Sequence, residues 1–359
     1  MLTKEPNNYY REIHFLIGAA ALVIILAGIN LAQSVVVLFL LAFFLALLGA
    51  PSVLWLKKKR IPSGIAVFIV MAAMISILIL FSAQIGSSIS SFTDELPLLQ
   101  IRINEQISDL VILLSGKGIA VNEKIFLEYI NPESIMSLTA VLLSGLSSVL
   151  SDTTLILLTV TFILLEVSNF PVKLRAVLGD PKQVFPEFTK FANDMKRYMV
   201  IKTLISIFTG VLVGLWLLIL GVDYPVLWGF LAFLLNYIPN IGSIIASIPP
   251  IILALIQNGV GSAVLTMSGY LVINIIVGNI LEPKLMGRRL NLSTLVVFVS
   301  MIFWGSLLGI IGAILSIPLT MTLKFAFERN DRTRWIAMLL ESENISKYSV
   351  PTSEKTKAK

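Results

Sequence analysis

The sequence lacks cysteine and has a single histidine, and these absences exclude several kinds of site. Without cysteine the chain can form no disulfide, iron–sulfur cluster or thiolate zinc site. The sequence also contains no HExxH zinc motif, no GxSxG nucleophile motif and no glycine-rich phosphate-binding loop. We therefore expect no catalytic residues, no metal and no cofactor, and we predict that the protein is not an enzyme.

Charged residues are also scarce. They make up 13% of the chain, against about a quarter in soluble proteins, while hydrophobic residues make up 57%. The mean hydropathy is +0.91. Several apolar runs approach or exceed the roughly 20 residues that a helix needs to cross the hydrocarbon core of a bilayer. These runs are 13–32, 34–56, 62–92, 141–168, 203–221, 226–256, 260–281 and 292–324. They predict an all-α polytopic membrane protein whose partner is the lipid bilayer.

The charge distribution predicts which loops face the cytoplasm. Basic residues fill 57–60 and outnumber acidic ones in 171–202, so both segments are predicted to be cytoplasmic. These loops explain the net charge of +6 without a nucleic-acid partner. Acidic residues predominate in 93–140, which suits the outer face and places the N-terminus in the cytoplasm. If every later run crossed the membrane once, however, the basic loop 282–289 would lie outside.

Two long runs, 226–256 and 292–324, remove this conflict if each folds back within the membrane. A straight helix of 31 residues would be about 46 Å long, well beyond a hydrocarbon core of roughly 30 Å. We therefore predict re-entrant hairpins that fold back at 236–242 and 304–309. This threading places the loop 282–289 and the C-terminus in the cytoplasm. A tilted helix with its ends outside the membrane is the alternative for each run.

The two predicted hairpins resemble each other. IGSIIASIP (241–249) and IGAILSIP (311–318) share an Ile-Gly start and a Ser-Ile-Pro end, and each hairpin follows one spanning run, 203–221 or 260–281. Helix plus hairpin, repeated with opposite sense, is typical of secondary transporters, whose substrate sites lie near the midplane. We expect about six spanning helices plus two re-entrant helical hairpins in an inverted repeat, together with amphipathic extramembrane helices.

This arrangement predicts five parts of the chain. They are N-terminal membrane helices (1–92), an extracytoplasmic amphipathic segment (93–140), a membrane helix with a cytoplasmic amphipathic helix (141–202), the transport core (203–324) and a cytoplasmic tail (325–359). In the 93–140 segment, apolar residues from Leu96 to Leu114 recur at helical spacing. This stripe would pack either against another subunit or against neighbouring helix ends of the same chain.

The first predicted fold-back places polar groups at membrane depth. Irregular backbone there must be buried in protein or line a cavity, because an unpaired peptide group in lipid costs several kcal/mol. Pro239 removes a backbone donor, and Gly242 lets the chain turn. The predicted substrate-binding residues are Asn236, Tyr237, Pro239, Asn240, Gly242, Ser243, Asn274, Trp304 and Gly305. Amide and hydroxyl groups without a strong charge suit a small, polar, uncharged solute.

Glu282 is the candidate for coupling transport to a proton or another cation, because a carboxylate at the membrane is a functional hypothesis by default. The alternative is a structural ion pair with Arg288 or Arg289. Hydroxyl residues also recur every three positions along 203–221, where they either line a path or allow close helix packing. These residues are Thr203, Ser206 and Thr209.

Three stretches resemble the autoinducer-2 exporter family of bacterial permeases. They are KTLISIFTG (202–210), NYIPNIGSIIASIPP (236–250) and GNILEPKLMGRRLNLSTLVVFVSMIFWGSLLGIIGAILSIPLT (278–320), and the likeness extends over most of the chain. The resemblance implies a bacterial inner-membrane exporter of a small furanone-type quorum signal. It also implies elevator-like movement and a homo-oligomer, with a pentamer as the expected size.

Members of this family have also been assigned sodium/proton antiport, so the resemblance implies the fold more closely than the substrate. Antiport is therefore the alternative function, and a non-transporting membrane scaffold is the other. The antiport function needs a titrating carboxylate, for which Glu282 is the candidate.

Overall fold

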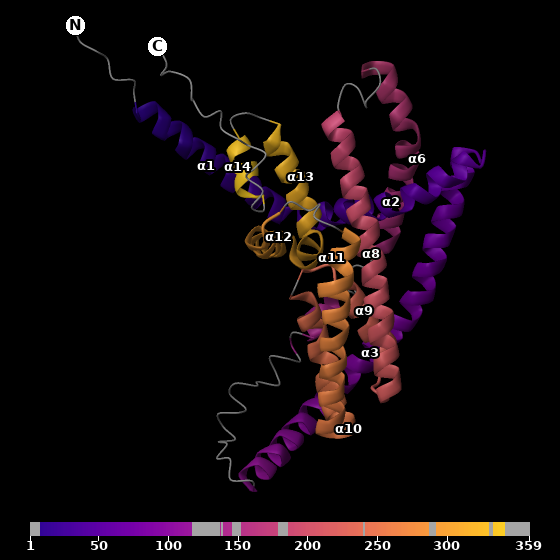
Figure 1. Ribbon diagram of the computed structural model, residues 1–359, viewed down its shortest axis with the longest axis vertical. Helices are drawn as coiled ribbons and strands as arrows, with labels where there is room; N and C mark the ends of the chain where they lie inside the picture. Colours follow the sequence, from indigo (N-terminus) through magenta and orange to yellow (C-terminus); the bar gives the residue numbers. More distant parts are fainter. Residues whose placement is uncertain are drawn as a thin grey trace, which may run out of the picture.

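A computed structural model gives the fold of the chain (Figure 1). It describes residues 8–116, 137, 139–145, 152–178, 186–239, 241–286, 292–329 and 333–341. Within these ranges every regular element is a helix, which confirms the predicted all-α class. In chain order the elements are α1 (Asn8–Leu31), α2 (Gln33–Lys58), α3 (Ser63–Gly116), α6 (Thr153–Leu178), α8 (Pro186–Leu220), α9 (Pro225–Leu235), α10 (Gly242–Asn274), the π-helix η1 (Ile275–Leu281), α11 (Glu282–Met286), α12 (Thr294–Ile314), α13 (Ser316–Glu328) and α14 (Arg334–Leu339).

Among the described residues, five helical segments are long and apolar enough to cross a membrane. They are Gln33–Lys58, Ser63–Glu95, Pro186–Leu220, Gly242–Met286 and Thr294–Ile314. Their most apolar stretches are only 22 to 33% buried inside the protein. Most of their apolar side chains therefore face outward, as a surface covered by lipid requires. Six spanning helices remain a prediction.

The helix break predicted around Pro239 is present. α9 ends at Leu235, and α10 begins at Gly242 after a short turn. The two sides of the turn approach so closely that a Cβ atom on Gly242 would overlap the carbonyl group of Leu235. Proline cannot donate the backbone hydrogen bond that would continue α9, so a turn at this position follows from the sequence.

The far ends of the same two helical arms also meet. The backbone amide of Asp223, just before α9, donates to Oε1 of Gln257 at 3.1 Å, and Nε2 of Gln257 donates to the Asp223 carboxylate. The chain therefore folds back on itself between 225 and 258. Gly259, with a φ of 80°, then separates this pair of arms from the second half of α10.

A second fold-back lies in α12 and α13. α12 bends at Gly309, where φ is 69°, the last residue of the predicted 304–309 break. A Cβ atom on Gly312 would overlap the carbonyl group of Trp304. Further along, Nε1 of Trp304 donates to Oγ1 of Thr320 at 3.1 Å, so the segments before and after Gly309 lie against each other.

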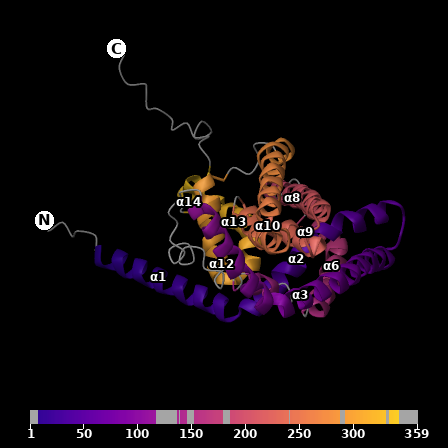
Figure 2. The same cartoon turned by 90° about the horizontal axis from the view of Figure 1, so that it is seen from below.

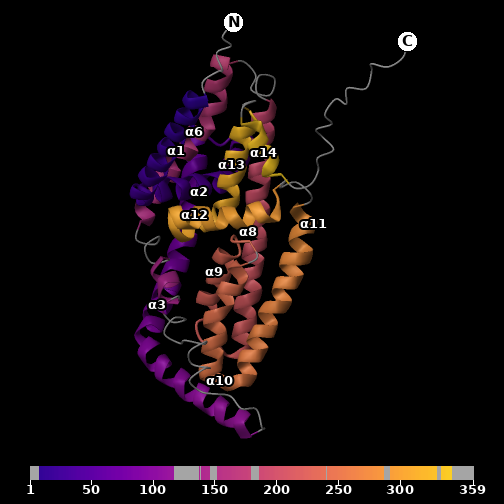
Figure 3. The ribbon, with the colours of Figure 1, turned by 90° about the vertical axis from the view of Figure 1, so that its left-hand side faces the viewer.

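α8 is the helix against which the first fold-back packs. It runs without interruption through the predicted boundary between 141–202 and 203–324. Figure 3 shows α8, α9 and α10 side by side, with the axis of α12 running crosswise to theirs. Gly210 of α8 and Gly229 of α9 let the two backbones approach closely, because a Cβ on either would lie 2.6 or 2.7 Å from the other's carbonyl oxygen.

The N-terminal helices lie to one side of this assembly. α1 extends away from the other helices (Figure 2), and Nδ2 of Asn30 near its end donates to the carbonyl of Leu307 in α12 at 3.2 Å. α3 is 54 residues long and continues past the predicted boundary at 92 and 93. The stripe predicted for 93–140 lies outside the residues whose side chains the structure describes.

Both fold-backs contribute to one hydrophobic core. Tyr237 and Ile238 from the first, and Ile314 and Leu315 from the second, are buried in the same cluster of side chains. Moving one break therefore changes the packing of the other.

Candidate functional site

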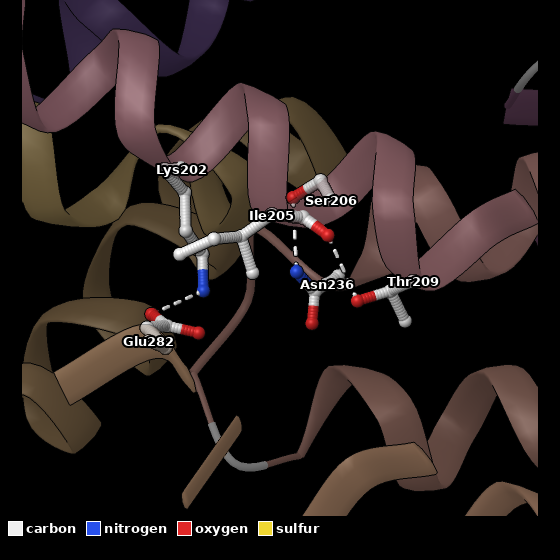
Figure 4. Close-up of polar contacts among 6 residues, drawn as sticks. All are labelled: Lys202, Ile205, Ser206, Thr209, Asn236 and Glu282. Carbon is white, nitrogen blue, oxygen red and sulfur yellow. Dashed lines mark hydrogen bonds and ion pairs between the residues drawn. The ribbon is translucent and has the colours of Figure 1, made fainter. Parts of the chain in front are cut away.

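The first break holds two polar side chains against the middle of α8. Nδ2 of Asn236 donates to Oγ of Ser206 at 3.0 Å, and the hydroxyl of Tyr237 donates to Oγ1 of Thr203 at 2.7 Å. Asn236, Tyr237 and Ser206 are all buried. Figure 4 shows Asn236 reaching α8 at Ser206, one turn along the helix from Lys202. Uncharged hydrogen-bonding groups are thus gathered at one point.

The hydroxyl row on α8 makes local hydrogen bonds as well. Thr203 donates its own hydrogen to the carbonyl of Met199 at 2.7 Å and accepts the hydrogen of Tyr237. Thr209 donates to the carbonyl of Ile205 at 3.0 Å (Figure 4). Two members of the predicted row, Thr203 and Ser206, therefore face the break.

Lys202, the residue before Thr203 on α8, forms an ion pair. Nζ of Lys202 is 2.6 Å from Oε1 of Glu282, and their side chains are 3% and 22% exposed (Figure 4). A buried charge is costly unless it is paired, so each group needs the other. The predicted alternative partners, Arg288 and Arg289, lie outside the described residues.

The backbone before Glu282 is unusual. The π-helix η1 connects Asn274, the last residue of α10, to Glu282, the first residue of α11. π-helices are rare and occur frequently at functional sites. Val277 in η1 is buried in one hydrophobic cluster with Ile205 of α8 and Ile317 of α13, which holds this segment beside the ion pair.

The other predicted site residues lie at the two breaks, except Asn274, which is half-buried at the end of α10. Pro239 and Ser243 are half-buried at the first break, and Asn240 lies outside the described residues. Trp304 and Gly305 belong to the second break, where a Cβ on Gly305 would lie 3.5 Å from Cβ of Ala313. The structure therefore joins Asn236 and Tyr237 to α8. It does not bring Trp304 and Gly305 to them, because the second break reaches the shared core through Ile314 and Leu315.

The sequence patterns do not identify Lys202 as a site residue. The charge pattern assigns it to the cytoplasmic loop 171–202, whereas it is buried within α8. Its position as a single basic residue between apolar residues, in VIKTLI (200–205), is the signal that could have identified it. Within the described residues, no group of three or more His, Cys, Asp or Glu side chains could hold a metal ion.

Comparison with known proteins identifies the family. A model of the AI-2E family transporter matches residues 19–331. The chain is 42% identical over 340 residues to AI-2 transport protein TqsA of Escherichia coli (strain K12), covering 95% of this chain and 99% of that protein. It is 36% identical over 340 residues to YhhT of the same organism, covering 95% and 97%. The family description and the first name describe transport and no enzyme activity. The chain therefore belongs to the AI-2E transporter family and is a multi-pass transporter of the bacterial inner membrane.

Proposed function

We propose that this transporter exports a small polar signal of the AI-2 type by alternating access. The observation that carries the proposal is the pair of neutral hydrogen bonds from Asn236 and Tyr237 to α8. They gather buried, uncharged donors and acceptors at a break between helices. The name of the Escherichia coli relative supports AI-2 as the solute.

The proposed cycle exchanges these hydrogen bonds for bonds to the solute. A neutral hydrogen bond contributes about 0.5–1.5 kcal/mol net, so a solute hydroxyl or carbonyl can replace Ser206 and Thr203 as partners at little cost. We infer that both folded-back segments enter the bilayer as re-entrant hairpins. The loop 282–289 and both termini are then cytoplasmic, and residues near Gly259 face outside.

Assembly as a homo-oligomer is part of the proposal, with a pentamer as the size that the family resemblance implies. Measuring the mass of the intact, detergent-solubilised assembly tests this proposal. A monomer at protein concentrations as high as those in a membrane would contradict the homo-oligomer.

Removing the polar groups of the first break should slow transport. For the Tyr237→Phe variant we expect AI-2 efflux from reconstituted vesicles to fall about tenfold, because a hydrogen bond to the solute worth roughly 1.4 kcal/mol is lost. Thr203 retains its bond to Met199, so the fold should be kept. The matched control is Ser247→Ala, whose exposed hydroxyl donates to its own helix at Ile244. Equal efflux from wild type and Tyr237→Phe would contradict a solute contact.

The buried ion pair favours sodium/proton antiport as the second candidate function. A titrating carboxylate could alternate between Lys202 and a transported cation. The double variant Lys202→Met and Glu282→Gln removes both charges together. We expect AI-2 efflux per folded protein to stay within about threefold of wild type, since neutral solute contacts are retained. Sodium-driven proton flux that is present in wild type and lost in the double variant would instead support antiport.

A further inference from the structure

A row of buried hydroxyl groups without hydrogen-bond partners lies on α10. Among the described residues, the buried side-chain oxygens that lack a partner are those of Ser262, Thr266, Tyr270 and Ser316. The first three follow one another at intervals of four in the second half of α10, after Gly259. Residues four apart are neighbours on a helix surface, so these three hydroxyls form one row.

The row faces the protein interior. The side chain of Thr266 is 0% exposed and that of Tyr270 is 6% exposed. Tyr270 is buried in one cluster with Leu217 of α8 and Leu253 of the arm that returns from the first break. Nε1 of Trp216 in α8 also donates to the carbonyl of Leu265 at 3.2 Å, which holds α8 against this part of α10. The hydroxyls therefore lie where three helical segments meet.

Burying a hydroxyl without a hydrogen-bond partner is costly, and no group of the described protein pairs with these three hydroxyls. The same helix shows that a hydroxyl can bond locally. Ser268, on the exposed side, donates to the carbonyl of Val264 at 2.7 Å. The three inward-facing hydroxyls are therefore available to bind hydrogen-bonding partners that reach them in another conformation of the protein.

We propose that Ser262, Thr266 and Tyr270 form a track that binds a small, uncharged, polyhydroxylated solute between Gly259 and the first break. Each hydroxyl can both donate and accept, which matches the hydroxyls of such a solute. Asn274 continues the four-residue spacing and adds an amide at the end of the row. The track opens when the 242–258 arm moves relative to α8. This inference rests on the proposed transport of a neutral signal and specifies the path that the signal takes.

Isosteric variants separate a transport role from a structural one. In the Thr266→Val and Tyr270→Phe double variant, no hydrogen bond of the described state is lost, so the thermal unfolding midpoint should stay equal or rise. AI-2 efflux should fall at least about tenfold, since contacts to the solute are removed. The Ser268→Ala control should export at the wild-type rate. Wild-type efflux from the double variant would overturn the track while leaving the proposed function intact.

Chemical labelling tests the track without measuring transport. The sequence contains no cysteine, so a single introduced thiol reports one position. With protein reconstituted in both orientations, a membrane-impermeant thiol reagent should modify Thr266→Cys, and added AI-2 should slow the reaction. Asn258→Cys at the exposed turn is the control that should react with the reagent. Ser268→Cys, on the outward face of α10 that lipid covers, is the control that should not react. If Thr266→Cys reacts no faster than Ser268→Cys while Asn258→Cys reacts, the track is overturned, whether or not the wild type exports AI-2.

Discussion

The Gly242→Ala variant should lose about 3 kcal/mol of folding free energy, an effect expected when a methyl group is forced into a closely packed site. The new Cβ would overlap the carbonyl group of Leu235 and lie 3.0 Å from Cβ of Ile238. The obstructing group is backbone, so no rotamer change relieves the overlap. The turn must open, which moves Asn236 and Tyr237 away from α8. Denaturant unfolding of the solubilised protein and AI-2 efflux measure the two consequences.

Gly261→Ala is the matched control in the same helix. No atom lies within 4 Å of its new Cβ, so this variant should be as stable as wild type or more stable by up to about 1 kcal/mol, because alanine favours helix. Gly312→Ala should behave like Gly242→Ala, since its Cβ would overlap the carbonyl group of Trp304 in the second break. A Gly242→Ala protein with wild-type stability would mean that the turn does not need the close approach described above.

Removing one partner of the Lys202–Glu282 pair should destabilise the fold by about 3–5 kcal/mol, the range seen when a buried ion pair loses one member. The two single variants should differ. Glu282→Gln leaves an ammonium group that is 3% exposed, whereas Lys202→Met leaves a carboxylate that is 22% exposed and can still reach water. The Glu282→Gln variant should therefore be the less stable of the two. Denaturant unfolding measures both values.

The double variant completes this test. Lys202→Met combined with Glu282→Gln should recover much of the loss, giving a coupling energy of about 2 kcal/mol or more in a double-mutant cycle. Glu328→Gln is the control at a looser ion pair, where Glu328 is 44% exposed and 3.6 Å from Lys324. Lys324 also lies 3.8 Å from Glu341, so the cost of this variant should stay below about 1 kcal/mol. Strictly additive single effects at Lys202 and Glu282 would show that the two charges do not depend on each other.

The sequence predicts the helix breaks well because their causes are local. Pro239 cannot continue α9, and Gly242 tolerates the contact with Leu235, so both residues act through their own backbone. The second break is predicted at 304–309 and occurs at Gly309, whose φ of 69° favours glycine. The continuity of α8 is harder to predict, because the cytoplasmic amphipathic helix expected within 141–202 and the apolar run 203–221 resemble two separate helices.

The site is predicted only in part because its pairings are long-range. Asn236 and Tyr237 are identified from the polar residues around the break, and Thr203 and Ser206 from their spacing, yet no local pattern pairs the two sets. Lys202 is missed because counting charges assigns basic residues near an apolar run to the cytoplasm. Its partner lies 80 residues further along the chain, and only the packing of α8 against α11 brings the two together.

The π-helix between Asn274 and Glu282 affects the direction in which the Glu282 side chain points. A π-helix closes its hydrogen bonds one residue later than an α-helix and is equivalent to an inserted residue. An α-helix turns by about 100° per residue, so if the same residues of Ile275–Leu281 closed α-helical hydrogen bonds instead, everything that follows would rotate by roughly that angle. The Glu282 carboxylate would then point away from α8, although Glu282 itself is unchanged. The hydrogen-bond pattern of this stretch therefore determines whether Glu282 can reach Lys202.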